Sequence, residues 1–256
     1  MHSNTKKVRI VSFDINPIAL TSLFEKIAEW IKEKKGRTIC VSGAHGCLEA
    51  YDNKEFADAH NNADIAIPDG RPIFWSLKLL GYKNAEHLRG EFVTRNLCKY
   101  AEEHDFEIGF YGGKKETLEK CVKKLKDKHK KLKINYVYSP PFRKLTEEED
   151  QKVILDINSS QTKILFVALG CPTQEKWMAS HRDNLKCVCL GIGAAVDYIS
   201  GDLFIAPRWL QVLGLEWFVR LVFEPRRLYK RYFKIIFRFI LLFAIQLIKK
   251  NTKSLT

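Results

Sequence analysis

Short apolar runs alternate along the chain with segments in which apolar residues recur every three or four positions. The short runs are rich in β-branched residues and predict buried strands. These runs cover residues 8–15, 38–43, 63–68, 106–112, 132–138, 162–170 and 186–193. Helical spacing, with one apolar face, predicts helices over 19–35, 114–131 and 147–158. Apolar strands that alternate with helices predict an α/β fold with a mainly parallel sheet and helices on both faces.

The last part of the chain has a different pattern and a different charge. It holds 11 lysines and arginines and 2 acidic residues from residue 208 on, a net charge of +9 within a total of +13. On a helical wheel its cations fall within an arc of about 140°, opposite an aromatic and aliphatic face. These cations are Arg226, Arg227, Lys230, Arg231, Lys234 and Arg238. We therefore divide the chain into a body, residues 1–205, and a basic amphipathic helical appendage, residues 206–256.

This pattern is typical of a helix that lies on an anionic membrane surface. The apolar run 233–248 is about 24 Å long as a helix, which is short of a hydrocarbon core of about 30 Å. We therefore expect the appendage to lie on the bilayer or dip into it rather than cross it. The alternatives are a helix that packs on the body or on another subunit, as in a homo-oligomer, and a helix that binds nucleic acid. Nearly continuous apolar residues beside the cations speak against nucleic acid.

The cysteines and the start of the chain indicate the cellular compartment. The amino terminus shows no signal-peptide pattern, and no run of 18 apolar residues predicts a membrane span. The seven cysteines form no C-x-x-C pair, so we expect reduced thiols in the cytosol. Cys187 and Cys189 alternate across a predicted strand, which favours a place in the core over metal binding.

The loops that follow the predicted strands carry the candidate chemistry, because α/β sheets bind ligands at the carboxyl ends of their strands. The sequence contains no G-x-S-x-G, Walker A or H-E-x-x-H motif, and its G-x-G at 191–193 lacks the third glycine of a dinucleotide loop. It also has no Asp-x-Asp for a metal-bound sugar diphosphate, which suggests metal-independent chemistry.

One carboxylate, Asp69, follows a strand in a Pro-Asp-Gly sequence. Glycine turns and the appendage arginines Arg220, Arg226 and Arg227 are suited to hold phosphates. This combination suggests transfer of a group from a nucleotide diphosphate, with Asp69 taking a proton from the acceptor hydroxyl. The alternative is that Asp69 is an ordinary turn or helix-cap residue, since Asp-Gly is a common turn pair.

Six segments together resemble the WecG/TagA/CpsF glycosyltransferase family, glycosyltransferase family 26. They are PDGRPIFW (68–75), FYGG (110–113), YSPPFRKLTEEED (138–150), LGCPTQEKWMASHR (169–182), GIGAAVDYISG (191–201) and APRWLQVLGLEWFVRLVFEPRRLYKRY (206–232). The segment ICVSGAHGCLEAYD (39–52) is more similar to the capsule and exopolysaccharide branch than to the teichoic-acid branch.

The resemblance implies a Rossmann-like body with a carboxyl-terminal membrane-binding appendage. It implies an inverting transferase, without metal or cofactor, that moves a sugar from a UDP-sugar to a polyprenyl-diphosphate-linked sugar. The donor would carry N-acetylmannosamine, its uronic acid, glucose or glucuronic acid. The enzyme would work as a peripheral protein at the cytoplasmic face of the plasma (inner) membrane of a bacterium.

The resemblance also assigns residues. Asp69 matches the family's proposed catalytic base, and Arg220 and Arg227 match cations that complete the site. Gln174 matches the glutamine of a P-x-Q-E motif beside the sugar-nucleotide pocket, and Lys230 replaces an arginine. The residues expected around the substrate are Gly43, His45, Gly70, His87, Arg89, Tyr111, Gly112, Gly113, Gln174, Gly193, Asp197, Arg226 and Lys230.

Two loops depart from the family pattern. Val41 and Gly43 stand where the teichoic-acid branch has Thr and Asn, and His45 is a candidate substitute. The family's arginine before its G-x-D motif falls on His87, with Arg89 two residues further on. The aspartate of that motif falls on Phe92, with Glu91 adjacent, so either a shifted local alignment or a changed sugar preference applies here.

Two other functions remain open on the sequence. A Rossmann oxidoreductase would bind NAD(P) through the G-I-G-A-A sequence at 191–195. A non-catalytic membrane adaptor on a transferase fold would explain the altered G-x-D motif.

Overall fold

The computed structural model describes residues 6–207, 210–211, 214–215, 218, 221 and 225–253; the side chains of 222–233 and 250–253 are not part of this description.

Six parallel strands form one sheet in the order β4-β3-β8-β7-β5-β6. The strands are β3 (Arg37–Ser42), β4 (Ile65–Pro68), β5 (Ile108–Gly112), β6 (Ile134–Tyr138), β7 (Ile164–Ala168) and β8 (Val188–Gly191). Each lies within a run predicted from the sequence or one residue outside it, so the parallel sheet is confirmed. Because every strand points the same way, the loops that follow them meet at one edge of the sheet.

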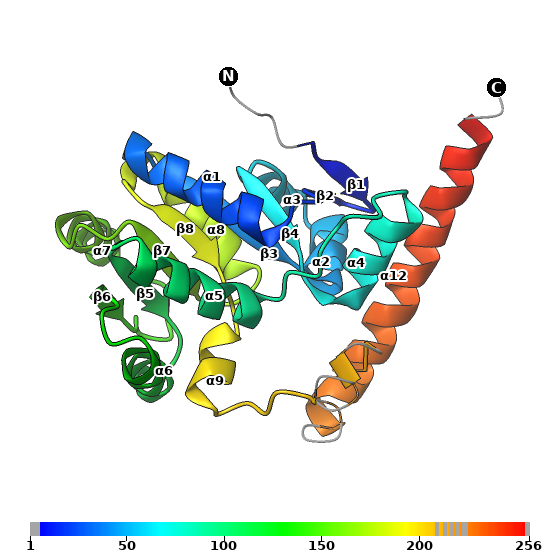
Figure 1. Ribbon diagram of the computed structural model, residues 1–256. Coiled ribbons are helices and arrows are strands. Elements are labelled where there is room, and N and C mark those ends of the chain that lie inside the picture. The colour runs from blue at the N-terminus through cyan, green and yellow to red at the C-terminus, as the bar shows by residue number, and fades with distance from the viewer. Residues whose placement is uncertain are drawn as a thin grey trace.

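Helices cover both faces of this sheet, as predicted (Figure 1). One face packs against α1 (Leu20–Glu33), α5 (Gly90–Glu103), α6 (Lys115–Lys128) and α9 (Ala195–Ser200). The other packs against α2 (Ala44–Asp52), α3 (Lys54–Asn61), α4 (Gly70–Leu79), α7 (Glu147–Ser159) and α8 (Thr173–His181), which the short 3₁₀ turn η1 (Arg182–Asn184) follows. The helices predicted over 19–35, 114–131 and 147–158 correspond to α1, α6 and α7.

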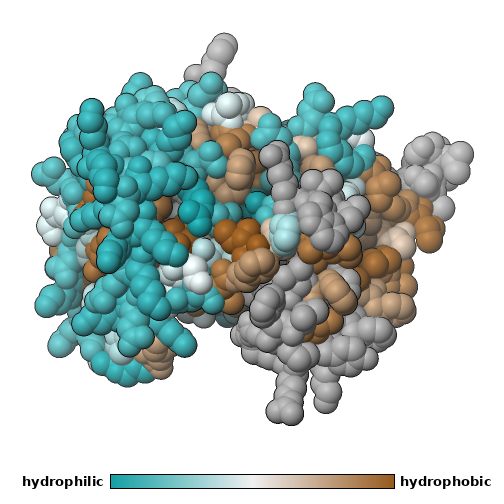
Figure 2. Space-filling model, turned by 60° about the horizontal axis from the view of Figure 1, so that its bottom comes forward, coloured by the Kyte–Doolittle hydropathy of each residue, from teal (hydrophilic) through white to brown (hydrophobic). Residues whose placement is uncertain are grey.

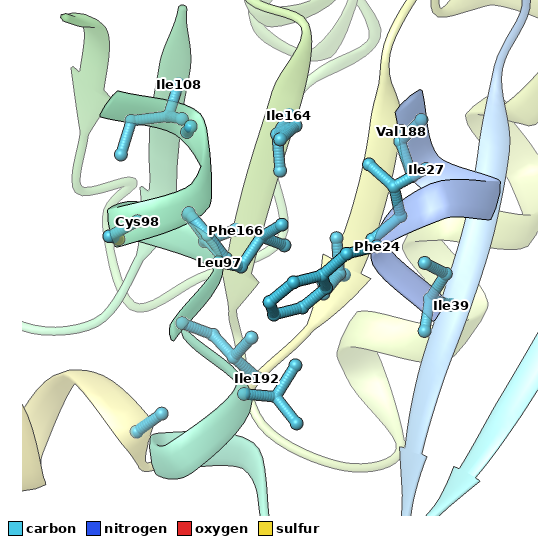
Figure 3. Packing of buried hydrophobic residues seen from close by; sticks show 14 of the residues in the cluster. Phe24, Ile27, Ile39, Leu97, Cys98, Ile108, Ile164, Phe166, Val188 and Ile192 are labelled. Atoms are coloured by element: carbon cyan, nitrogen blue, oxygen red, sulfur yellow. The ribbon is translucent and has the colours of Figure 1, made fainter. Parts of the chain in front are cut away.

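Side chains of the central strands alternate between two cores. On β7, Ile164 and Phe166 belong to the first core, and Leu165 and Val167 belong to the second. Figure 3 shows Phe24 of α1 and Phe166 of β7 among the side chains of the first core. Two cores on one sheet explain why the strands read as uninterrupted apolar runs.

The run 8–15 is not one strand of the large sheet, which corrects the sequence prediction. It folds into an antiparallel hairpin of β1 (Val8–Ile10) and β2 (Phe13–Ile15), with Val11 in the left-handed region at φ 55°. The fold-back puts the apolar side chains of both short strands into the second core. Beyond β2, Asn16 exchanges two hydrogen bonds of 2.8 Å with the backbone of Ala66, next to the edge of the sheet.

The appendage contains one long helix, α12 (Pro225–Lys253), which packs on α2 of the body. Phe239 and Phe243 are buried in the second core. Arg238 donates two hydrogen bonds of 2.5 Å to Asp52. Gln246 accepts from the backbone N–H of Val11 and donates to the carbonyl of Arg9, both at 2.7 Å. The packing alternative for the appendage is thus realised on one side of α12.

A second apolar side of α12 remains exposed. Its large exposed side chains are Phe237, Ile240, Leu241, Ile245 and Ile248. Their spacing of three, one, four and three residues places them along one stripe of the helix. In Figure 2 hydrophobic side chains gather on the right, where α12 lies in Figure 1, and the left is mostly hydrophilic. Within the part of the chain described here, no helix is long and apolar enough to cross a membrane.

His60 on α3 makes the stability of the fold depend on pH. Its ring stacks on Phe13 at 3.5 Å between centroids, and its Nε2 lies 2.7 Å from the hydroxyl of Ser42. Burial lowers the pKa of His60 from 6.5 to about 3. The unfolded chain therefore binds a proton below pH 6.5 that the folded protein excludes, so stability present at neutral pH is lost as the pH falls from 6.5 towards 3.

We expect the burial of His60 alone to lower the free energy of unfolding by roughly 1 kcal/mol between pH 7.5 and 5.5. Urea titrations at both pH values, on the wild type and on His60→Gln, measure this. The variant loses stability at both pH values but should show a pH dependence weaker by that amount. Equal pH dependence in the two proteins would contradict the assignment.

Candidate active site

A cavity of about 870 Å³ opens at the carboxyl ends of the strands. The segments after β3, β4, β5, β7 and β8 line it, as expected for an open parallel sheet. The predicted site residues that line it are Gly43, His45, Asp69, Gly70, Arg89, Gln174, Gly193 and Asp197. Its volume is within the usual range for small-molecule sites.

Asp69 is the first residue after β4 and precedes the first turn of α4. Its backbone N–H donates to the carbonyl of Ser42 at 2.9 Å, which ties the ends of β3 and β4 together. The residue takes the N-cap position of α4, but its side chain makes no capping hydrogen bond. The Asp69 carboxylate therefore does not cap α4, which speaks against its being a helix-cap residue.

Two glycines shape the space around Asp69. Gly70 has φ +71°, a conformation that β-carbon-bearing residues rarely adopt. A β-carbon on Gly43 would lie 3.8 Å from Oδ2 of Asp69, so the carboxylate faces the loop after β3. His45, in the first turn of α2, lines the same cavity. The expected neighbourhood of Gly43, His45, Asp69 and Gly70 is thus present.

The start of α5 places Arg89, its N-cap residue, and Glu91, in its first turn, at the cavity. His87 and Phe92 are not among the residues that line it. The His87 ring packs against Phe74 at 5.7 Å, and burial, with Arg71 and Arg89 nearby, lowers its pKa to about 4. His87 is therefore neutral at physiological pH and cannot replace an arginine as a cation. Of these four residues, Arg89 and Glu91 are the cation and the carboxylate that the structure places at the cavity.

Gln174 lies in the first turn of α8, and both the oxygen and the nitrogen of its side-chain amide are hydrogen-bonded. Its Oε1 accepts from the backbone N–H of Gly193 at 2.9 Å, and its Nε2 donates to Oε1 of Glu175 at 2.8 Å. A β-carbon on Gly191 would lie 3.0 Å from that Nε2. Gln174 therefore joins the loops after β7 and β8 at the cavity wall.

Tyr111, Gly112 and Gly113 are not among the residues that line the cavity. The Tyr111 ring is buried against Trp177 at 4.6 Å, and this burial raises the pKa of its hydroxyl. A β-carbon on Gly112 would come within 2.6 Å of the backbone of Ala168, so this glycine lets β5 and β7 end close together. The structure thus gives Tyr111 and Gly112 packing roles, and their predicted contact with substrate has no support in it.

Sequence reasoning missed three polar residues of the cavity wall: Arg71, Lys114 and Glu175. Arg71 directly follows Asp69-Gly70, and this position after a predicted strand could have marked it as a candidate site residue. Its Nε donates to the carbonyl of Gln211 at 2.9 Å. A β-carbon on Gly214 would meet Arg71 and Trp75 within 2.9 Å, so α4 also holds the segment that leads to α12.

The appendage cations cannot be placed at the site. Arg220 lies outside the described residues, and the backbone of Arg226, Arg227 and Lys230 lies in α12 but their side chains are not described. Ile235 and Ile236, further along the same helix, line the cavity. With a rise of about 1.5 Å per residue, Arg227 lies about 12 Å along the helix axis from Ile235.

The cavity combines carboxylates with cations. Arg71, Arg89 and Lys114 carry positive charge at its wall. Among the residues described, no group of three or more His, Cys, Asp or Glu side chains is arranged to hold a metal ion. Asp69 can accept a proton from a hydroxyl, and the cations can stabilise an anionic leaving group.

A parallel sheet with helices on both faces and a cavity beyond its strand ends defines an α/β protein of the ligand-binding, doubly wound type. Residues 8–253 match the glycosyl transferase WecG/TagA/CpsF family, and the chain belongs to that family. It is therefore a glycosyltransferase, and an oxidoreductase function of the G-I-G-A-A sequence has no support.

Two curated relatives are similar over most of the chain, and both are named N-acetylglucosaminyldiphosphoundecaprenol N-acetyl-β-D-mannosaminyltransferase. The protein from Bacillus subtilis (strain 168) is 28% identical over 210 residues, 81% of this chain and 80% of the relative. The protein from Bacillus spizizenii (strain ATCC 23059 / NRRL B-14472 / W23) is 28% identical over 200 residues, 77% of this chain and 76% of the relative.

Proposed function

We propose that this glycosyltransferase moves a sugar from a UDP-sugar to a sugar that is linked to a polyprenyl diphosphate. The placement of Asp69 carries the proposal: its carboxylate faces the cavity loop at Gly43 and does not cap α4. The acceptor class rests on the relatives, whose names describe transfer to N-acetylglucosaminyldiphosphoundecaprenol.

The reaction is a single displacement. Asp69 takes the proton of the acceptor hydroxyl, and the hydroxyl oxygen attacks the anomeric carbon from the side opposite UDP. The bond between that carbon and the diphosphate oxygen breaks, UDP leaves, and the configuration inverts. Arg71, Arg89 and Lys114 stabilise the departing diphosphate, and Arg220, Arg227 and Lys230 of the appendage complete this set.

We place the donor sugar among N-acetylmannosamine, its uronic acid, glucose and glucuronic acid. The relatives' names favour N-acetylmannosamine. Gly43 and His45 at the cavity wall support a changed sugar contact, as in an enzyme of capsule or exopolysaccharide synthesis.

We propose that the body, residues 1–205, is held at the cytoplasmic face of the plasma membrane by the appendage, residues 206–256. The exposed stripe of α12 supports lipid contact, because apolar side chains exposed together mark interaction surfaces. The lipid-linked acceptor keeps its sugar close to such a surface. A homo-oligomer that covers the same stripe is the competing arrangement.

A panel of UDP-sugars tests the function. The intact protein is mixed with each donor and undecaprenyl-diphosphate-N-acetylglucosamine in vesicles, and UDP release is measured with and without EDTA. We expect release above background with one of the four donors, unchanged by EDTA. Release that requires added metal would refute metal independence, and no release with any donor would refute the proposed pairing of donor and acceptor.

A further inference from the structure

Glu175 is a buried acidic residue in the cavity wall that the reaction itself does not use. The side chain is 3% exposed, and its Oε2 has no hydrogen-bond partner among the described residues. A buried polar atom without a partner is unfavourable and uncommon in folded proteins. Glu175 thus lowers stability where it stands, which calls for another reason for its presence.

The other carboxyl oxygen of Glu175 has a defined task. Oε1 accepts the hydrogen bond of 2.8 Å from Nε2 of Gln174. An amide can point either way round, and this bond selects the orientation in which Nε2 faces Glu175. The carbonyl oxygen of Gln174 then faces the N–H of Gly193, to which it is bonded at 2.9 Å.

Gly193 lies in the loop after β8, which lines the cavity from Gly191 to Ala195. Gly193 has φ +50°, a backbone conformation that glycine adopts readily because it has no β-carbon. Backbone hydrogen bonds of Ile192 and Ala195 hold the two ends of this loop, and the hydrogen bond that the Gly193 N–H donates to Gln174 restrains the residue between them. Two hydrogen bonds thus link Glu175 through the amide of Gln174 to the backbone of Gly193.

We propose that Glu175 is a positioning residue: it orients the amide of Gln174, which in turn holds the Gly193 loop in the shape that receives the sugar nucleotide. This inference rests on the proposed function, because the ligand of the loop is the UDP-sugar. It predicts that the two residues act as one unit in donor binding.

Glu175→Met tests the inference, because methionine has a similar shape and accepts no strong hydrogen bond. We expect the KM for the UDP-sugar to rise roughly tenfold, with kcat changed less than about threefold. The melting temperature should stay level or rise, since the unpartnered carboxyl oxygen is gone. Glu175→Gln keeps an acceptor for Gln174 and should recover most of the lost affinity.

Gln174→Met supplies the background for a double-mutant cycle. If Glu175 acts through Gln174, then Glu175→Met should change KM less than about twofold in a protein that already carries Gln174→Met. Lys176→Ala is the matched control, because Lys176 on the same helix pairs with the exposed Glu55 instead. Its KM should equal that of the wild type.

Equal effects of Glu175→Met in both backgrounds, or a wild-type KM in Glu175→Met, would overturn the inference. A loss of melting temperature that Glu175→Gln restores without restoring KM would also overturn it, because it would indicate a structural role only. Absence of turnover in the wild type with every donor would instead count against the proposed function. UDP binding by calorimetry then still compares the variants.

Discussion

Asp69→Asn should lower sugar transfer by about a hundredfold to ten-thousandfold, the usual contribution of general base catalysis. Asparagine has the same shape but accepts no proton at neutral pH. The Asp69 side chain makes no capping bond to α4, and the melting temperature of the variant checks that the fold is intact. UDP release with saturating donor and acceptor measures the rate, and calorimetry with the UDP-sugar measures binding, which should stay within about threefold of the wild type.

Asp127→Asn is the matched control for this substitution. Asp127 lies on the exposed face of α6 and pairs only with Lys130 among the ion pairs described, so its removal should leave turnover unchanged. A near-wild-type rate in Asp69→Asn would remove Asp69 as the base. Lost donor binding together with lost turnover would assign it to substrate binding instead.

Replacing three exposed apolar residues of α12 with glutamine should detach the protein from lipid. Phe237, Ile240 and Ile248 are 67%, 60% and 64% exposed, and none of them lines the cavity. If each contributes about 1 kcal/mol in the interface, the triple variant should bind vesicles roughly a hundredfold more weakly. Flotation with vesicles that contain anionic lipid measures this partition.

The triple variant should also separate lipid contact from chemistry. Transfer to an acceptor in vesicles should fall, and transfer to a short-chain, water-soluble acceptor should stay at the wild-type rate. Leu155→Gln is the control, because Leu155 is 67% exposed but lies on α7 of the body. A wild-type protein that stays entirely in the aqueous fraction would refute the membrane contact. A triple variant that floats like the wild type, but changes its sedimentation, would indicate a subunit interface instead.

Deletion of the appendage is a weaker test than these substitutions. From the sequence, removal of the chain beyond about residue 205 should leave a folded body. The structure shows that Phe239 and Phe243 cover part of the second core, so a deletion would expose it. A loss of activity after deletion would then mix destabilisation with loss of membrane contact.

The strands of the sheet could be predicted from the sequence because a strand that is buried on both faces is apolar at nearly every position. Strands such as β7 are apolar at every position, and the helices between them show one apolar face. The hairpin at 8–15 was missed because the fold-back at Val11 carries no glycine, asparagine or proline signal. A run of eight apolar and polar residues gives no sign that it will turn in its middle.

At the site, sequence reasoning identified the residues that follow strands, such as Asp69 and Gln174, because the edge of a parallel sheet gathers them. It could not separate Arg89 from His87, since two residues of shift along a loop have no periodic signature. It could not show how Tyr111 packs, because the contact of its ring with Trp177 joins segments far apart in sequence. Glu175 was missed because its environment depends on burial and not on its neighbours in the chain.

The hydrogen bond between the backbone N–H of Val11 and the side chain of Gln246 joins residues 235 positions apart. During synthesis the first hairpin therefore leaves the ribosome long before its partner helix exists. Until α12 emerges, the surface that receives Phe239 and Phe243 has nothing to cover it. The growing chain thus exposes apolar side chains of the second core until α12 has been made and can cover them.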